Sequence, residues 1–292
     1  MTYILTLVAR RDAASLTDAV IGRVRDAVRG GAPTILSPGE AADIPVAEAP
    51  DPAPVAAALG GAAIDAIAVK ARGRRKALLI ADMDSTIIQG ETLDELAVFA
   101  GIGDRIAAIT ARAMNGELDF KQALRERVAM LKGLPVDALE RTWQRVRMTD
   151  GARELVATMR ARGAMTALVS GGFSFFTGRV AETLGFDLHR SNTLLDDGAV
   201  LTGAVGEPIL DRDTKLATLR ELAERRGLKL SATMAVGDGA NDLDMLQAAG
   251  LGIAFHAKPI VAAAAKARLD HAGLRALLFA QGYPASAFAG VD

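Results

Sequence analysis

The hydrophobic pattern of the chain changes near residue 76. Before that point, residues 15–29 carry apolar positions every three or four residues, which predicts a helix with Ser15 as its cap. The strand candidates are residues 3–9, 33–38 and 64–69. Residues 55–59 are a short helix candidate, and the proline-containing stretch 39–54 is predicted to be loop. This order predicts a small α+β module over residues 1–75, which could regulate the protein or mediate dimerisation.

After residue 76 the apolar positions are typical of an α/β domain. Continuous apolar runs, which indicate strands buried on both faces, occur at residues 77–81, 166–169, 233–236 and 252–255. Helical patterns lie between these runs, at residues 151–162, 175–184 and 214–226. Strands that alternate with helices predict βαβ units and a Rossmann-like parallel sheet. A hairpin is also predicted, around Asp197-Gly198.

The first strand of this domain is separated from the second by a helical insertion. Residues 89–148 contain little strand pattern, and glycines divide them into four helix candidates at residues 92–100, 104–114, 120–131 and 136–146. The predicted architecture is therefore a core formed by residues 76–88 and 149–292, with a helical cap at residues 89–148. The basic run at residues 70–76 is interpreted as a solvated linker between module and core.

Composition excludes several classes of function. Thirty-four lysines and arginines balance 35 aspartates and glutamates, so no general attraction to nucleic acid or to anionic membrane is expected. The chain has no cysteine, which rules out thiolate metal sites and cysteine nucleophiles. No apolar run approaches the roughly 18 residues of a membrane span, and the first residues resemble a strand more than a signal peptide. We therefore expect a cytoplasmic protein.

Acidic residues follow two of the apolar runs. Asp82 and Asp84 come after the first run, and Asp238 follows the third between two glycines. Ligands of open α/β sheets bind beyond the carboxyl ends of the strands, where these side chains would meet. Each carboxylate pair at about 4 Å would repel by roughly 4 kcal/mol at an effective dielectric constant near 20. A divalent cation with oxygen ligands, Mg²⁺ above all, would relieve this repulsion. Taken singly, such aspartates could also be turn formers or helix caps.

Two further candidates could hold an anion. Ser170 and Gly171 follow the second apolar run and precede a helix, which places a hydroxyl and backbone N–H groups at a helix start. Lys215 opens a later helix and could neutralise a phosphate. Each has an ordinary alternative, a glycine-rich turn for the first and a solvated surface lysine for the second.

The order of these four signals resembles that of the haloacid dehalogenase-like phosphatases, and within that family it is most similar to the phosphoserine phosphatases. The matching segments are Asp82-Met83-Asp84-Ser85-Thr86 with Glu91, Ser170-Gly171-Gly172-Phe173, Gly237-Asp238-Gly239-Ala240-Asn241-Asp242 and Phe255-His256-Ala257-Lys258-Pro259. The resemblance covers residues 76–280 and leaves out the N-terminal module. It implies a Rossmann-like core with a cap, and hydrolysis of O-phospho-L-serine to L-serine and phosphate, the last step of serine biosynthesis.

The resemblance also implies residue roles. Asp82 would be the nucleophile that forms an aspartyl-phosphate, and Asp84 would be the general acid and base. The metal would be held by Asp82, by Asp238 and by the backbone carbonyl of Asp84, with Asp242 in support. The phosphoryl oxygens would be bound by Ser170, Gly171, Lys215 and Asn241.

The cap would read the rest of the substrate. Arg127 lies on the apolar face of the third cap helix, so its guanidinium is either extended to solvent or paired. The resemblance assigns it to the substrate carboxylate, whereas the ordinary alternative is a salt bridge between cap and core. Glu91 would bind the substrate ammonium, or else it is simply an acid at a helix start. Met114 and Phe120 would line an apolar lid.

The leading hypothesis is therefore a Mg²⁺-dependent phosphatase acting on the small molecule phosphoserine, as a possible homodimer through its N-terminal module. One alternative is the same chemistry, or phosphotransfer, on another small phosphomonoester. The other is a non-catalytic regulatory protein that binds a small molecule.

Overall fold

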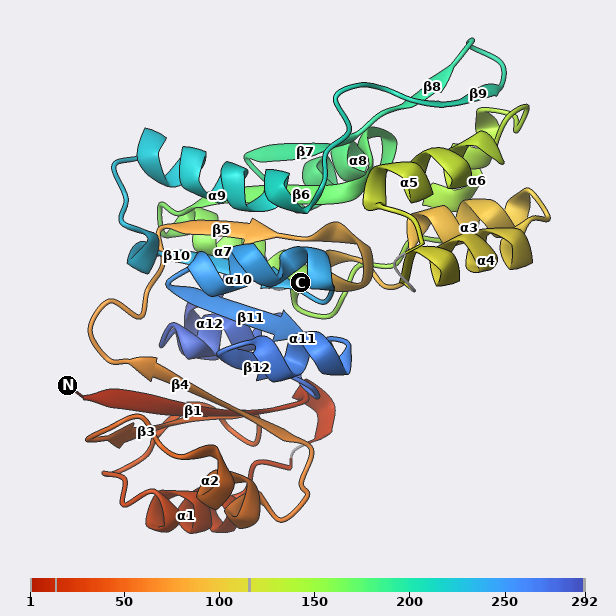
Figure 1. The fold of residues 1–292 in the computed structure, drawn as a ribbon. Helices are drawn as coiled ribbons and strands as arrows, with labels where there is room; N and C mark the ends of the chain where they lie inside the picture. The colour runs from red at the N-terminus through yellow and green to blue at the C-terminus, as the bar shows by residue number, and fades with distance from the viewer. Residues whose placement is uncertain (1, 14, 115–116, 291–292) are drawn as a thin grey trace.

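The computed structural model describes residues 2–13, 15–114 and 117–290. The N-terminal module is a four-stranded antiparallel sheet in the order β2-β3-β1-β4, with two helices on one face (Figure 1). Its elements are β1 (Tyr3–Ala9), α1 (Asp18–Ala27), β2 (Thr34–Ser37), β3 (Ala41–Val46), α2 (Pro52–Leu59) and β4 (Ile64–Lys70). This β-α-β-β-α-β sequence of elements is the ferredoxin-like arrangement.

Strand β3 lies in the stretch predicted to be loop, and that prediction is wrong. The strand alternates its side chains between two buried faces. Ala42, Ile44 and Val46 pack on the module's helices, whereas Ala41 joins the hydrophobic core of the rest of the chain. Short side chains and Pro45 conceal this alternation in the sequence. The helix cap was also misplaced: Thr17, and not Ser15, accepts a hydrogen bond from the backbone of α1.

The core domain contains a six-stranded parallel sheet in the order β12-β11-β10-β5-β6-β7. Its strands are β5 (Leu78–Ala81), β6 (Met165–Phe173), β7 (Leu188–Asn192), β10 (Thr233–Gly237), β11 (Leu251–Phe255) and β12 (Ala267–Leu269). The four predicted strands are the central ones. The two edge strands, β7 and β12, carry polar side chains and lack the continuous apolar run of a strand buried on both faces.

Helices cover both faces of this sheet (Figure 1). On one face, α9 (Arg212–Arg225), α10 (Leu243–Ala248) and α11 (Pro259–Ala264) enclose a hydrophobic cluster. The other face packs against α7 (Ala152–Ala161), α8 (Ser174–Leu184) and α12 (Ala276–Ala280). The predicted α/β class with a parallel sheet, helical insertion and separate N-terminal sheet is confirmed.

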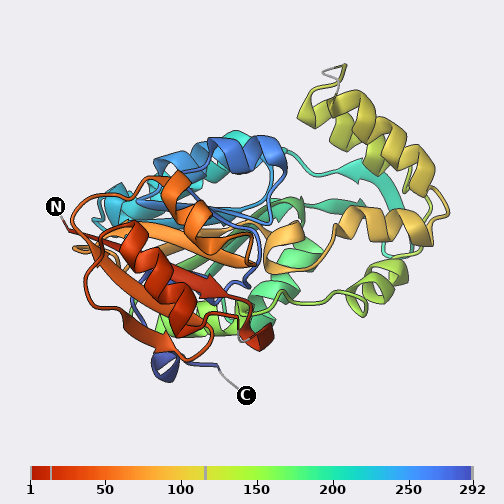
Figure 2. The same ribbon diagram turned by 90° about the horizontal axis from the view of Figure 1, so that it is seen from below.

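The cap lies beyond the carboxyl end of β5, away from the N-terminal module (Figures 1 and 2). Its helices are α3 (Thr92–Phe99), α4 (Gly103–Met114), α5 (Phe120–Ala129) and α6 (Asp137–Trp143). The hairpin of β8 (Leu194–Asp196) and β9 (Leu201–Val205) extends from the core and braces this cap. Its Leu201 exchanges backbone hydrogen bonds with the segment after α5, donating to Leu134 and accepting from Gly133 at 2.8 Å each.

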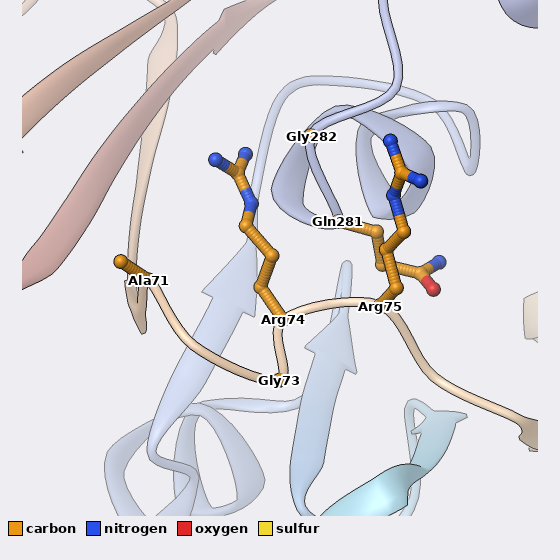
Figure 3. A pocket seen from close by; sticks show the side chains of 6 residues that line it. All are labelled: Ala71, Gly73, Arg74, Arg75, Gln281 and Gly282. Atoms are coloured by element: carbon orange, nitrogen blue, oxygen red, sulfur yellow. The ribbon is translucent and has the colours of Figure 1, made fainter.

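The basic run at residues 70–76 is not simply a solvated linker. Arg74 donates hydrogen bonds to the Asp43 carboxylate at 2.8 Å and to the carbonyl of Phe279 at 3.0 Å, so it joins the module to the core. Figure 3 shows the Arg74 and Arg75 side chains extending from the linker toward Gln281 and Gly282 around a cavity of about 390 Å³. The Arg75 guanidinium lies 4.6 Å from the centre of the Tyr283 ring.

Candidate active site

The chain turns sharply at the end of β5, where the two predicted catalytic aspartates stand. Asp82 is almost fully buried, and its Oδ1 accepts the backbone N–H of Met83 at 2.8 Å. Asp84 directs its side chain elsewhere. Its Oδ1 accepts the Thr92 N–H at 2.9 Å, at the start of cap helix α3, and its Oδ2 faces the Ser170 hydroxyl at 3.3 Å. The two carboxylates therefore have different environments, as two different roles require.

Three carboxylates from distant parts of the chain meet at this point. Strands β5 and β10 are parallel neighbours, with Ala81 paired to Val236, so Asp82 and Asp238 leave the same edge of the sheet. Asp82, Asp238 and Asp242 each place a carboxylate oxygen within 4.8 Å of the other two. The approach is close: a Cβ atom added to Gly237 would lie 2.3 Å from the Asp242 Cγ. These oxygens could hold a hard metal ion.

Asp84 is not part of this side-chain cluster, and Asp242 is. The predicted metal residues were Asp82, Asp84 and Asp238, with Asp242 in support. The direction of the Asp84 side chain leaves its backbone carbonyl as the group that would contact a metal, so that assignment stays a prediction.

Lys215 is a buried counter-charge for the cluster. Its Nζ lies 2.8 Å from Oδ2 of Asp82 and 2.6 Å from Oδ1 of Asp242. Helix α9 sets this position, because Asp211 and Thr214 form a capping box that fixes its first turn. Burial lowers the Lys215 pKa, but the two carboxylates outweigh burial and raise it above its ordinary value. The alternative of a solvated surface lysine is wrong, because Lys215 is buried, whereas its binding to a phosphate stays a prediction.

The folded protein disfavours the ionised forms of these acidic side chains, as their raised pKa values show. Burial, followed by the charge of Glu91, raises the pKa of Asp84 to about 6. Burial, followed by the charges of Asp242 and Glu91, raises the pKa of Asp238 to about 6. Burial also raises the pKa of Asp82, with Asp242 adding to the effect and Lys215 opposing it. A bound cation would favour the ionised forms of these groups.

The phosphate-loop candidates lie beside the aspartates. Strand β6 continues through Ser170, Gly171 and Gly172, and the Gly172 N–H donates to the Ser170 hydroxyl at 2.8 Å. The cap reaches this loop: a Cβ atom added to Gly171 would lie 3.2 Å from Cζ of Phe120, at the start of α5. A larger residue than glycine would therefore require the Phe120 ring to move by a few tenths of an ångström.

Arg127 is a half-buried guanidinium on the cap. Its Nε donates to the Ala123 carbonyl at 3.3 Å, and no described carboxylate forms an ion pair with it. The predicted alternative, a salt bridge from cap to core, is therefore not present among the described residues. Burial lowers the pKa of Arg127, whereas the charges of Asp94 and Glu91 raise it. An arginine held in this way has its remaining donors available for an anion.

Glu91 lies at the start of α3 and is exposed, with its Oε1 accepting the Ser85 hydroxyl at 2.8 Å. Phe120 stands at the cap–core boundary, as an apolar lid requires, whereas the side chain of Met114 lies outside the described residues. Asn241 is half-buried in the loop after β10, where its Oδ1 leaves no space for a side chain on Gly239.

Sequence reasoning missed two buried side chains near the site. Thr86 donates to Oδ1 of Asp238 at 3.1 Å, and its position two residues after Asp84 could have suggested this contact. Asn192, at the end of β7, donates from its Nδ2 to the Gly171 carbonyl at 2.8 Å. It is the last residue of a strand that the pattern did not predict, so no sequence signal pointed to it.

The profile of the haloacid dehalogenase-like hydrolases matches residues 79–247, more than half of the chain. A phosphoserine phosphatase of Streptococcus thermophilus is 50% identical over 186 residues, which cover 64% of this chain and 86% of that protein. The chain belongs to the phosphoserine phosphatase branch of the haloacid dehalogenase-like hydrolases.

Other relatives differ in how far the match extends. A phosphoserine phosphatase of Archaeoglobus fulgidus is 48% identical over 188 residues, which cover 64% of this chain and only 55% of that relative. The chain thus spans about half the length of some curated members of the family. A crystal structure of a probable phosphoserine phosphatase from Vibrio cholerae superposes with a TM-score of 0.80 at 34% identity. That match covers 98% of this chain and 88% of the other, so it includes the N-terminal module.

Proposed function

We propose that the protein is a Mg²⁺-dependent phosphoserine phosphatase that forms an aspartyl-phosphate on Asp82. The observation that carries this proposal is the meeting of Asp82, Asp238, Asp242 and Lys215 beside the separately held Asp84. Relatives named phosphoserine phosphatase, identical at about half of the aligned positions, support the choice of substrate.

Two aspartates divide the chemistry of the reaction. An oxygen of Asp82 attacks phosphorus, and the bond from phosphorus to the serine oxygen breaks. Asp84 gives its proton to that leaving oxygen, then accepts a proton from the water that attacks phosphorus and releases Asp82. A pKa raised to about 6 suits a group that both donates and accepts a proton near neutral pH.

The site residues fit a hard divalent cation. Asp82, Asp238 and Asp242 offer only carboxylate oxygens, and in chemistry of this class Mg²⁺ neutralises charge on the transferring phosphoryl group. Lys215, Ser170, the Gly171 N–H and Asn241 would hold the phosphoryl oxygens. This division of labour is positioning plus charge neutralisation, which dominates phosphoryl transfer.

The cap would supply specificity for an amino acid. Arg127 could bind the substrate carboxylate with its planar donors, and Glu91 could bind the ammonium. Closure of the cap would exclude bulk water, leaving only a positioned water to attack.

The proposal also covers the domain boundaries, the pairing of two copies and the location in the cell. The domains would be residues 1–75, residues 76–88 with 149–292, and the cap at 89–148. The module would pair two copies through β2, an edge strand with an exposed Ile35, and light scattering would test this.

Among the described residues no helix is long and apolar enough to cross a membrane. A cytoplasmic location is proposed as the compartment of serine biosynthesis, and cell fractionation would test it.

A substrate panel tests the proposed function. Phosphate release in MgCl₂ is measured with phosphoserine, phosphothreonine and sugar phosphates as substrates. We expect phosphoserine to be turned over with the highest kcat/KM, and complementation of a serine auxotroph would place the activity in the cell. Equal turnover of sugar phosphates would contradict the amino acid substrate, and the Arg127→Met variant would then behave as the wild type.

A further inference from the structure

Asn192 is a buried amide that connects two parts of the proposed phosphate site. It ends β7, and only 2% of its surface is exposed. Its Nδ2 donates to the carbonyl of Gly171 at 2.8 Å and to that of Leu210 at 3.3 Å. Its Oδ1 accepts the Leu210 N–H at 2.7 Å. Every polar atom of the side chain is therefore engaged with the backbone of one of these two loops.

The contact with Gly171 fixes the phosphate loop. Asn192 holds the carbonyl of the Gly171–Gly172 peptide, and the N–H of that same peptide donates to the Ser170 Oγ at 2.8 Å. Because that lone pair of Ser170 is occupied, the hydroxyl proton is free to point at Oδ2 of Asp84, 3.3 Å away. A continuous chain of hydrogen bonds thus leads from Asn192 to the proposed general acid.

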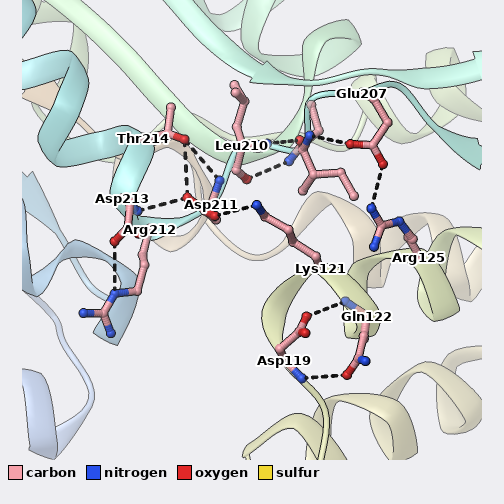
Figure 4. Close-up of polar contacts among 12 residues, drawn as sticks. Asp119, Lys121, Gln122, Arg125, Glu207, Leu210, Asp211, Arg212, Asp213 and Thr214 are labelled. Carbon is pink, nitrogen blue, oxygen red and sulfur yellow. Dashed lines mark hydrogen bonds and ion pairs between the residues drawn. The ribbon is translucent and has the colours of Figure 1, made fainter.

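The contact with Leu210 fixes the other side of the site. Leu210 precedes Asp211, the N-cap of α9, and Lys215 lies in the first turn of that helix. The Asp211 carboxylate also receives Nζ of Lys121 from cap helix α5 at 3.1 Å (Figure 4). The segment that Asn192 holds is therefore the one that sets the start of α9 and contacts the cap.

We propose that Asn192 is a positioning residue, which holds the Ser170–Gly172 loop and the Lys215 helix at a fixed separation around the phosphoryl group. This inference rests on the proposed function. No other side chain among the described residues forms hydrogen bonds to both Gly171 and Leu210. Removing the amide would leave the Gly171 carbonyl and both Leu210 backbone groups without these partners, and the loop could then shift relative to Lys215.

The test compares Asn192→Ala with Gln281→Ala. Gln281 is an equally buried amide that also links two backbone segments, accepting the Lys76 N–H at 2.9 Å and donating to the Leu277 carbonyl at 3.1 Å. It lies beside the linker (Figure 3), and its partner Lys76 precedes β5, whereas Asp82 follows the opposite end of that strand. Both variants should lose a similar amount of thermal stability. A shift of about 1 Å in a reacting group can lower the rate about 100-fold, so we expect kcat of Asn192→Ala to fall at least about tenfold.

Binding of inorganic phosphate in MgCl₂ should weaken about fivefold, as loss of one hydrogen bond predicts. KM for phosphoserine should rise by no more than that factor, because Arg127 and Glu91 are untouched. Gln281→Ala should keep kcat within twofold. Asn192→Asp keeps the shape and the acceptor of the side chain but loses its donors, so it should show the same loss of kcat. This variant replaces Asn192→Ala in the test if the alanine variant does not fold. Unchanged kcat and phosphate binding in a folded Asn192 variant would overturn the proposal.

The proposed function can fail separately. If the wild type does not hydrolyse phosphoserine, the same comparison is made with p-nitrophenyl phosphate and with phosphate binding measured by calorimetry. If hydrolysis and phosphate binding are then lost only in the Asn192 variants, the positioning role is supported although phosphoserine is not the substrate. A wild type that neither hydrolyses nor binds phosphate would refute both.

Discussion

Replacing Asp238 with asparagine should stabilise the metal-free protein. Three carboxylate oxygens stand within 4.8 Å of one another, and among the described residues Lys215 forms ion pairs with Asp82 and Asp242 but not with Asp238. Burial, followed by the charges of Asp242 and Glu91, outweighs the Thr86 hydrogen bond and the more distant Lys215, and raises the pKa of Asp238 to about 6 instead of 3.8. A shift of this size corresponds to about 3 kcal/mol of unfavourable free energy when the group is ionised. Asparagine removes the charge, and its Oδ1 can still accept the Thr86 hydroxyl.

The effect depends on pH in a defined direction. A carboxyl whose pKa is higher in the folded than in the unfolded state binds its proton more tightly when folded. Stability from this group is therefore present at low pH and is lost as the pH rises from about 4 to about 6. Above that window the wild type carries the whole penalty and Asp238→Asn does not. We expect the variant to be more stable by up to about 3 kcal/mol at pH 8 and by much less at pH 4.

Urea denaturation in EDTA and in MgCl₂, at both pH values, measures this difference. Mg²⁺ should stabilise the wild type and have little effect on Asp238→Asn, because a ligand has been removed. Asp244→Asn is the matched control, since Asp244 lies in the first turn of the following helix α10 and pairs with Arg212 at the surface at 2.9 Å, where a change below about 1 kcal/mol is expected. A less stable Asp238→Asn variant in EDTA, or one stabilised by Mg²⁺ as strongly as the wild type, would refute the reasoning.

Two other substitutions test the remaining charges. Lys215→Met should lower the free energy of unfolding in EDTA by about 3–5 kcal/mol, because it leaves Asp82 and Asp242 buried without their counter-charge, and the loss should be smaller in MgCl₂; an equal loss with and without Mg²⁺ would argue against a shared charge cluster. Arg127→Met should raise KM for phosphoserine at least about tenfold while kcat/KM for p-nitrophenyl phosphate, which has no carboxylate, stays within about threefold; parallel losses on both substrates would show that Arg127 serves the cap's structure instead.

The sequence was informative where one kind of side chain dominates an element. The central strands are continuous apolar runs, so these strands and the polar residues at their ends could be predicted. Strand β3 was missed because its two buried faces carry alanine, aspartate and proline as well as large apolar residues. The edge strand β7 was missed because it is polar, and Asn192 was missed with it.

The candidate site, too, could be predicted from the sequence only in part. Asp82 and Asp238 follow neighbouring parallel strands, so their meeting follows from the parallel sheet, and their charges need a counter-charge such as Lys215. The grouping of Asp242 with the cluster and the turning of Asp84 toward Thr92 depend on loop conformation, which hydrophobic pattern does not encode.

The central claim is that Asp82 carries the phosphoryl group during turnover. Acid quenching of the enzyme with labelled substrate and MgCl₂ within a single turnover, followed by peptide mass spectrometry, measures this directly. The account predicts label on the peptide that contains Asp82, and none in the Asp82→Asn variant. Phosphate release by the wild type without label on that peptide, or undiminished turnover by Asp82→Asn, would contradict it.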